Sequence, residues 1–515
     1  MKIGLWRPIE FTHLPSLSQI TRLEQDALEV LRLVRSIKNR FAPISRIPPE
    51  LLSLIPRYWD KDPGDNNLIV LTHVCRGWRD IFTAYSSLWT HLDCSNIGKT
   101  CAYIERSKSS PLEISLHEYR NTYYRKDVFL LAIPHIDRVT SINVFGGEKL
   151  LQDITEHLSC PVPLLRNVTI NITCSPPPVL SSRLFGSDLS SLRTLNMSGV
   201  VPHLPWKNIP RLTTFVFRHA SGHRVSVTPL LDFFANAPSL CEVELGSIPD
   251  SSDAPPGRVV SLPSLKSLTI LADSQPSSIL LSHLSIPTRA SLYLEIDLCD
   301  PGSLFQKFIP NTTINLQNIS TISSVCIDFG AADISIQLNG RIGGVSMLGY
   351  RSWSMAGPTI PDSAIIRSLD YFALSRVQRL AITMYDARRL EETDTAHHHF
   401  FDTTKHLRTL FLNQSNNRPF ILALNPDESP AKQILCPELE GIFLYIEDRK
   451  SFDIEELDSM ARERALVGAK LHSLRVVCQN RLVPEEELFR LREHVAHVEC
   501  RVVKSLPRWD SILDE

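Results

Sequence analysis

One six-residue pattern, apolar-x-x-apolar-x-apolar, constrains the fold of this chain more than any other feature. It occurs nine times between residues 165 and 476, with copies starting 20 to 28 residues apart in the first five and 30 to 32 apart in the last four. Residues two apart in a strand point to the same face, so each copy predicts a short strand with one buried face. The copies begin at Leu165, Leu192, Leu212, Leu240, Leu265, Val377, Leu407, Leu439 and Leu471.

Strands repeated at this spacing favour a solenoid, because stacked parallel strands share a core that no single repeat can bury. The pattern resembles leucine-rich repeats in a degenerate form, since the asparagine that should follow each copy after two further residues is absent. Uneven repeats and an irregular curve are therefore expected, with helical returns at stretches such as Leu230 to Asn236 and Ile365 to Leu374. The alternative is that a Leu-rich chain produces such short patterns by chance.

The pattern blurs between Ala290 and Trp353. Two triplets there still fit it, Ile322-Val325-Ile327 and Ile342-Val345-Met347, but several glycines interrupt the region. Glycine inside a strand-like segment indicates turns and hairpins. The glycines that predict hairpins are Gly330, Gly340, Gly343 and Gly344.

The chain also predicts a long amphipathic helix near its start. From Ile20 to Phe41 apolar residues recur at alternating spacings of three and four, as on one stripe of an α-helix. Ser16 and Gln19 stand at the spacing of a capping box, which would begin this helix. Two interpretations are open: a coiled-coil dimer through residues 20–41, or a helix whose stripe packs on the next domain.

Two shorter helices are expected after it. Pro49 suits the first turn of a helix, because the N–H that it lacks would have no partner there, and the helix dipole favours Glu50 at that end. Pro56 should end this first helix near Ile55, since an interior proline breaks or kinks a helix. After a polar loop at 60–67, a second helix is expected to carry one apolar stripe from Leu71 to Tyr85.

This segment, with Pro-Pro-Glu-Leu-Leu at 48–52, Val-Cys-Arg-Gly-Trp-Arg at 74–79 and Ser-Leu-Trp at 87–89, resembles an F-box of the type abundant in mushroom-forming fungi. The resemblance covers residues 41–116 and extends to a strand at 89–92, a helix at 103–107 and a strand at 112–116. It implies docking to a Skp-type adaptor and, through it, a cullin ubiquitin ligase. Ile47, Pro56 and the insert at 60–67 depart from the family pattern. The residues expected to contact the adaptor are Ile47, Pro48, Pro49, Leu51, Leu52, Ile55, Leu71, Val74, Cys75, Trp78, Leu88 and Trp89.

Composition narrows the classes of partner. The net charge is −2, from 54 basic and 56 acidic side chains, so no excess of positive charge favours nucleic acid or an anionic membrane. No apolar run is long enough for a membrane-spanning helix or a signal peptide. The 11 cysteines, an odd number without a C-x-x-C pair, favour reduced thiols and a location in the cytoplasm, the nucleus or both.

Motifs of common enzymes are absent from the sequence, including the glycine-rich nucleotide-binding, metalloprotease and serine-hydrolase motifs. We therefore expect no enzyme, no cofactor and no metal. The adjacent histidines 397–399 are interpreted as part of a solvated loop. The residues between the apolar positions of the repeats should face the open side of the solenoid and hold a protein target. These candidates are Arg193, Val216, Arg379, Arg408, Phe411, Phe443 and Arg475, and the alternative is that other parts of the chain cover them.

The fold class expected is α/β, with a short all-α F-box-like module followed by an irregular leucine-rich-repeat-like solenoid with a parallel sheet. The divisions expected are an N-terminal helix (1–40), the F-box-like domain (41–95), a connecting segment (96–160), the solenoid (161–503) and a C-terminal tail (504–515). The function expected is that of a substrate receptor in a ubiquitin ligase. The rival is a non-catalytic interaction scaffold, in which the helical module only caps the solenoid.

Overall fold

A computed structural model shows how the chain folds. It describes residues 16–58, 67–118, 125–181, 183–186, 189–201, 208–218, 227–246, 257–271, 274–297, 309–310, 314–329, 333–340, 344–350, 374–384, 396–414, 418–427, 434–446, 454–478 and 483–503. The chain divides into two compact units, Met1–Asn143 and Val144–Glu515. No helix in the described part of the chain is both long and apolar enough to cross a membrane.

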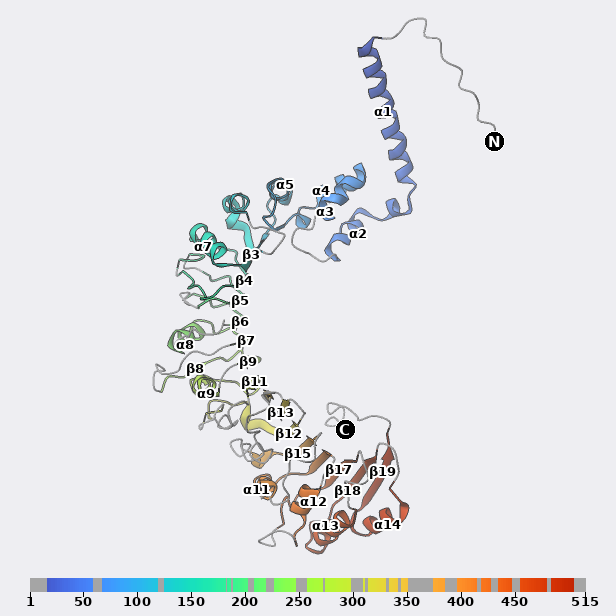
Figure 1. Ribbon diagram of the computed structural model, residues 1–515, viewed down its shortest axis with the longest axis vertical. Coiled ribbons are helices and arrows are strands. Elements are labelled where there is room, and N and C mark those ends of the chain that lie inside the picture. The colour runs from blue at the N-terminus through green and yellow to red at the C-terminus, as the bar shows by residue number, and fades with distance from the viewer. Residues whose placement is uncertain are drawn as a thin grey trace, which may run out of the picture. The chain divides into compact units, whose positions relative to one another are not determined.

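The first unit is mainly helical (Figure 1). Its α-helices are α1 (Leu17–Arg40), α2 (Pro49–Leu52), α3 (Asn67–Val74), α4 (Arg76–Ala84), α5 (Ile97–Ser107) and α6 (Lys126–Phe129). Short 3₁₀ helices lie between them: η1 (Pro43–Arg46), η2 (Ile55–Tyr58), η3 (Ser86–Leu88) and η4 (Ile133–Arg138). Strands β1 (His91–Leu92) and β2 (Leu112–His117) belong to this unit, and β3 (Val139–Gly146) begins in it.

Helix α1 confirms the predicted N-terminal helix and its capping box. The Ser16 side chain accepts a hydrogen bond from the Gln19 backbone N–H, and the Gln19 side chain accepts one from the Ser16 backbone N–H. Lys38 and Arg40 lie in the last turn, where the negative end of the helix dipole favours positive charge. No residue of this helix is buried within the part of the chain that the structure describes. The interpretation in which its stripe packs on the next domain is therefore not supported.

The two helices expected after α1 differ from the prediction. The first, α2, ends at Leu52, and Pro56 lies inside the separate 3₁₀ helix η2. The single helix expected from Leu71 to Tyr85 is wrong, because Cys75 is extended (φ −159°, ψ 172°) and separates α3 from α4. The Cys75 sulfur accepts a hydrogen bond from the Trp78 backbone N–H at 3.5 Å and so caps α4.

The strand, helix and strand expected after the module are confirmed as β1, α5 and β2. Strands β1 and β2 run parallel, with His91 opposite Glu113 and Leu92 opposite Ile114. Asn96 caps α5 by accepting a hydrogen bond from the Lys99 backbone N–H at 3.0 Å. At the other end of α5, the Arg138 guanidinium donates to the Lys108 and Ser110 carbonyls and so binds carbonyls that follow the last helical turn.

The second unit is a mixed α/β structure with a large, mostly parallel sheet. Its main strands are β4 (Asn167–Ile172), β5 (Thr194–Ser198), β6 (Thr214–Arg218), β7 (Glu242–Leu245), β9 (Ser267–Leu271), β11 (Ser291–Asp297), β12 (Ile322–Phe329), β13 (Asp333–Gly340), β14 (Gly344–Tyr350), β15 (Arg379–Met384), β16 (Thr409–Gln414), β17 (Gly441–Ile446), β18 (Ser473–Cys478) and β19 (His497–Val502). A separate short pair is β8 (Val260–Ser261) with β10 (Leu284–Ser285).

Helices connect many of these strands, and Figure 1 shows α8, α9 and α11 on the same side of the strands. The helices of the second unit are α7 (Glu148–His157), α8 (Val227–Ala235), α9 (Ser274–Ser282), α11 (Ala396–Thr403), α12 (Arg418–Leu424), α13 (Ile454–Leu466) and α14 (Glu485–His494), with 3₁₀ helices η6 (Ile319–Thr321) and η8 (Leu374–Arg376). Helix α8 confirms the helix predicted at 230–236. The one predicted at 365–374 lies almost wholly outside the described residues.

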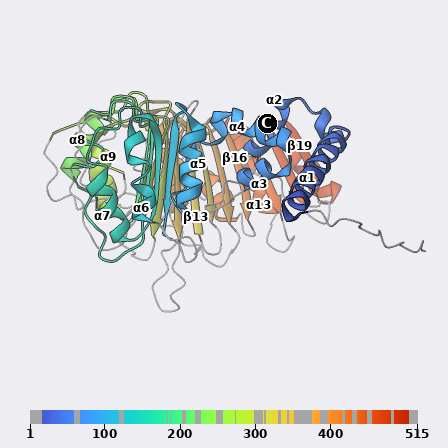
Figure 2. The same ribbon diagram turned by 90° about the horizontal axis from the view of Figure 1, so that it is seen from above.

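All nine copies of the repeated pattern lie on parallel strands. The order β4-β5-β6-β7-β9-β11-β14 is parallel throughout, and so is β12-β15-β16-β17-β18-β19. The strands lie side by side in Figure 2. The last two apolar residues of each copy are buried, as Val168 and Ile170 of β4 illustrate. The period-two prediction is therefore confirmed strand by strand.

The glycine-rich region joins these two series of strands. Strand β13 pairs antiparallel with β12 on one side and with β14 on the other, so the predicted hairpins are confirmed. A Cβ on Gly344 would lie 2.2 Å from the Leu338 carbonyl oxygen. Only glycine fits that close backbone approach, which explains why this part of the chain departs from the repeat pattern.

Candidate protein-binding surfaces

The helical module of the first unit has a small core of its own. Leu52 of α2, Leu71 of α3 and Phe82 of α4 are buried together. Trp78 and Phe82, one turn apart on α4, meet edge to face with their ring centroids 5.6 Å apart. These contacts bring α2, α3 and α4 into one cluster despite the short first helix. The partly buried side chains around this core are Ile55, Leu68, Trp78, Ile81 and Leu88.

Trp89 connects this core to the following helix. Its side chain is 0% exposed, and its indole N–H donates to the Phe82 carbonyl at 2.9 Å. Its ring meets Tyr103 of α5 edge to face, with centroids 4.9 Å apart, and the Arg106 guanidinium lies 4.4 Å from the ring centroid. The indole thus contacts side chains of α5 and a backbone carbonyl of α4 at once, so we assign Trp89 a structural role.

A buried ion pair lies on the β1–α5 connection. The Lys99 ammonium is 2.6 Å from an Asp93 carboxylate oxygen, and the Ser95 backbone N–H and hydroxyl also donate to that carboxylate. Burial raises the pKa of Asp93, but the Lys99 hydrogen bond and charge, with the Ser95 hydrogen bonds, outweigh it and hold the pKa below its usual range. Asp93 is therefore an ionised structural group.

The predicted adaptor residues separate into an enclosed set and an exposed set. Leu52, Leu71 and Trp89 are buried, so they stabilise the module and offer no surface to a partner. Pro48, Pro49 and Ile47 are exposed at the start of α2. Leu51 of α2 is 55% exposed, and so is Val74 of α3. Partial exposure describes the rest of the set, namely Ile55, Cys75, Trp78 and Leu88.

The sequence interpretation missed Val70, which is 58% exposed. Val70 and Val74 lie four residues apart on α3 and therefore on the same helical face. The run Leu68-Ile69-Val70-Leu71 is apolar all round the helix, and a helix of that kind needs a second partner for the face that its own core does not cover. That run is the sequence signal that identifies Val70. The exposed large apolar side chains on α2 and α3, with the residue two before α2, are therefore Leu51, Val70, Val74 and Ile47.

A second candidate surface lies on strands β16 to β19. The rings of Phe411 and Phe443, direct neighbours in the sheet, stack with centroids 4.5 Å apart. The Arg475 guanidinium lies 5.1 Å from the Phe443 ring centroid, and its Nε donates to the Glu499 carboxylate at 2.8 Å. All four residues are in register on adjacent strands, so they form one row across the sheet. Glu499 was not identified from the sequence.

The expectation that Phe411 is exposed is wrong. It is 6% exposed and packs with Cys326, Ala381 and Phe443. Two of its neighbours in this row, Cys326 and Ala381, are small, so the ring can lie against them and lose contact with water. This burial supports the alternative that the chain itself covers part of the face expected to hold a target. Phe443 and Arg475 remain partly exposed.

The other predicted target residues are dispersed. Arg193, Arg379 and Arg408 are exposed and lie just before or at the start of strands β5, β15 and β16. Arg408 forms two long ion pairs, with Glu438 at 3.9 Å and Glu440 at 3.8 Å. Val216 of β6 is half-buried, so the apolar exposure predicted there is only partial. Of these candidates, the structure brings together Phe411, Phe443 and Arg475, on β16 to β18.

The histidines 397–399 are not in a loop, as expected, but in helix α11. Phe400 and Phe401, which follow them, are buried, and Phe401 meets Phe420 of α12 edge to face, which explains why this polar stretch is helical. In the residues that the structure describes, no group of three or more His, Cys, Asp or Glu side chains is arranged to hold a metal ion.

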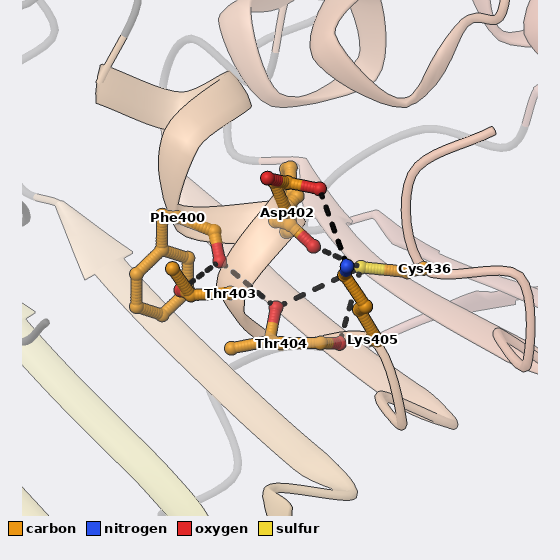
Figure 3. Close-up of polar contacts among 7 residues, drawn as sticks. Phe400, Asp402, Thr403, Thr404, Lys405 and Cys436 are labelled. Atoms are coloured by element: carbon orange, nitrogen blue, oxygen red, sulfur yellow. Dashed lines mark hydrogen bonds and ion pairs between the residues drawn. The ribbon is translucent and has the colours of Figure 1, made fainter. Parts of the chain in front are cut away.

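Figure 3 shows a polar cluster at the end of α11. The Thr403 and Thr404 hydroxyls donate to the Phe400 carbonyl, and the Cys436 thiol lies 3.7 Å from the Thr404 hydroxyl. Burial raises the pKa of Cys436 to about 12. A thiol with that pKa stays protonated at neutral pH and is a poor nucleophile, so this cluster is a packing and hydrogen-bonding element.

The chain was compared with known proteins. Models of known protein families give no match, and a search among curated proteins finds no similar sequence.

Proposed function

We propose that this protein is a substrate receptor of a cullin-type ubiquitin ligase, with the module at 41–95 docking a Skp-type adaptor and the second unit holding a protein target. The observation that carries the proposal is the helical module itself. It has a closed core and still exposes large apolar side chains, among them Ile47, Leu51, Val70 and Val74. Exposed apolar side chains on a well-packed scaffold are typical of protein interfaces.

The second unit is interpreted as an irregular leucine-rich-repeat-like solenoid. Parallel strands in register, each carrying one copy of the repeated pattern, support this proposal. Helix α8, which lies between β6 and β7 in the chain, also supports it, because the ring centroids of Phe233 on α8 and Phe215 on β6 are 4.6 Å apart. Each repeat then shares its core with its neighbours. The antiparallel strand β13 is the main interruption.

The row of Phe443, Arg475 and Glu499 supports a protein target over a nucleic acid. An aromatic ring and an arginine are common anchors of protein interfaces. Here Glu499 pairs with Arg475 at 2.8 Å and also with Arg501, so its carboxylate offsets part of the positive charge of these two arginines and both guanidinium groups are engaged in ion pairs. Together with the near-neutral charge of the chain, this favours a target bound through mixed apolar and ionic contacts.

The test uses the full chain, co-expressed with the Skp-type adaptor of its host. Leu51→Asp and Val74→Asp place a charge on side chains that are 55% exposed, so the module should still fold while its apolar surface is lost. Leu52→Asp is a poorer probe, because that side chain is 2% exposed and a buried charge would unfold the module. The expected result is a stable complex with the natural chain and at least about a tenfold weaker one with each exposed variant.

A matched control is Leu466→Asp, which makes the same change on a side chain that is 73% exposed at the end of α13. This variant should bind the adaptor as well as the natural chain does. Absence of a complex with the natural chain, or a complex indifferent to Leu51→Asp and Val74→Asp, would refute the receptor proposal. It would instead favour the scaffold, in which the helices only cap the solenoid.

A further inference from the structure

Helix α1 exposes an apolar stripe along its whole length. The helix has 24 residues, none of them buried, and its apolar positions alternate at spacings of three and four. Phe41, at the C-cap, extends the stripe and is 76% exposed. A continuous exposed stripe of this kind is typical of a surface that another helix covers. The stripe consists of Ile20, Leu23, Ala27, Val30, Val34, Ile37 and Phe41.

We propose that α1 is a dimerisation helix and that two copies of this chain pair through it as an antiparallel coiled coil. This inference goes beyond adaptor docking and does not depend on it. In the heptad notation of coiled coils, the stripe fills every a and d position over three heptads. Ile20, Ala27, Val34 and Phe41 then occupy a positions, and Leu23, Val30 and Ile37 occupy d positions.

The side chains that flank the stripe identify the partner as a second copy. In each helix the flanking e and g positions are acidic near the N-terminus, apolar in the middle and basic near the C-terminus. All of them are exposed. A surface that runs from negative to positive is complementary to itself when one copy is turned end for end. The flanking residues are Glu24 and Asp26, then Leu31 and Leu33, then Lys38 and Arg40.

One register satisfies both the core and the flanks. When Val30 of one copy lies opposite Val34 of the second, the small Ala27 faces the larger Ile37, and Leu23 faces Phe41. The same register places Glu24 opposite Lys38 of the second copy and Asp26 opposite Arg40 of the second copy. Because the pairing is two-fold symmetric, each ion pair occurs twice. Leu31 and Leu33 each face their own counterparts.

Parallel pairing offers no such match. In a parallel coiled coil, each g position faces the e position of the following heptad in the other helix. Asp26 would then face Leu31, and Leu33 would face Lys38, so no ion pair forms beside the core. Antiparallel pairing also aligns the two helix dipoles favourably, with the N-terminus of one near the C-terminus of the other. The charge pattern therefore specifies orientation as well as partner.

The first test measures the mass of the full chain by analytical ultracentrifugation in a dilution series, without any adaptor. The expected species is a dimer that dissociates on dilution. Lys38→Glu with Arg40→Glu turns four opposite-charge pairs into like-charge pairs. At roughly threefold for each pair, the dimer should weaken by about eightyfold. Adding Glu24→Lys and Asp26→Lys to that variant restores opposite charges and should restore the dimer.

The matched control is Arg32→Glu with Arg35→Glu, which makes the same two charge reversals on the outward face of α1. This variant should dimerise like the natural chain. A natural chain that is monomeric throughout the series overturns the proposal, whether α1 then binds its own chain or a different protein. So does a dimer that the Lys38→Glu and Arg40→Glu changes leave intact.

The second test measures orientation on a chain whose stripe and flanks are unchanged. Spin labels are carried on non-natural side chains at position 18 or position 32, because Cys101 is exposed and would take up a thiol label. In the antiparallel register the two labels at 32 lie level with each other on opposite sides of the coiled coil, whereas those at 18 are offset by about 42 Å along the axis. The distance between labels should therefore be much longer at 18 than at 32, and equal distances at both positions would mean parallel pairing and would overturn the proposal.

Discussion

Trp89→Phe is the sharpest probe of how the helical module is held together. The substitution keeps an aromatic ring beside Tyr103 and Arg106 but removes the indole N–H that donates to the Phe82 carbonyl at 2.9 Å. Leaving that buried carbonyl without its donor costs about 1–3 kcal/mol. The smaller ring leaves a cavity in a site that is 0% exposed, which adds about 1 kcal/mol. We expect a total loss of about 2–4 kcal/mol.

Hydrogen exchange of backbone amides in β2 (Leu112–His117) measures this loss locally, because the Glu113 N–H donates to the Thr90 carbonyl next to Trp89. A loss of 2 kcal/mol corresponds to about a thirtyfold faster exchange. Trp78→Phe is the matched control, since Trp78 is only partly buried and the same change should cost about 1 kcal/mol or less. Exchange that accelerates less than about threefold in Trp89→Phe, or at least as much in Trp78→Phe as in Trp89→Phe, would refute the role assigned to Trp89.

Three further predictions test other parts of the fold. Lys99→Met leaves Asp93 buried without its cation and should cost about 3 kcal/mol in urea unfolding at pH 7. The folded-state pKa of Asp93 is lowered, so the stability that its ionised form contributes to the natural chain is lost as pH falls through that pKa. The difference in unfolding free energy between the natural chain and Lys99→Met should therefore shrink below about pH 4, and a difference that stays constant with pH would contradict this prediction. Gly199→Ala should lower Tm by at least about 4 °C, because Gly199 has φ +67° and a Cβ there would lie 1.8 Å from the Ile172 carbonyl oxygen. Gly257→Ala should lower Tm by clearly less, because Gly257 has a similar φ of +75° but a Cβ there would meet no atom within 4 Å. The Cys436 thiol, with its pKa raised to about 12, should resist alkylation at pH 8 until the protein is unfolded, and rapid labelling of the folded protein would show that it is accessible.

Features of the fold that depend on residues close together in the sequence were predicted well. The strands of the second unit follow from a period of two, because alternate residues enter the core wherever the strand lies. The capping box at Ser16 and Gln19 requires only residues three apart, and α1 begins where it predicts. The hairpins around β13 follow from glycines such as Gly344, which the backbone there requires.

Features that depend on tertiary contacts could not be predicted in the same way. The break at Cys75 interrupts a regular apolar stripe, and it is stabilised by the Arg79 side chain, which donates to the Thr72 carbonyl across the junction at 3.0 Å. The burial of Phe411 depends on small neighbours in strands that are distant in sequence. Helix α11 forms in a polar, histidine-rich stretch because Phe401 packs on α12.

The candidate surfaces show the same division. The sequence identified Leu51 and Val74, which are exposed, together with Leu52 and Trp89, which are buried, because helical spacing alone does not distinguish the face that meets the core from the face that meets a partner. On the sheet, Phe411 and Phe443 occupy equivalent positions in consecutive copies of the pattern, but the stacking of their rings and the burial of Phe411 could be seen only in the structure.

The most direct test of the account is a hydrogen-exchange comparison of the full chain with and without its Skp-type adaptor. The account predicts slower exchange within α2 and α3, where Leu51 and Val74 are exposed, and little change in the strands β16 to β19. No slowing in the helical module at adaptor concentrations that saturate a known receptor, or slowing confined to the sheet, would contradict it.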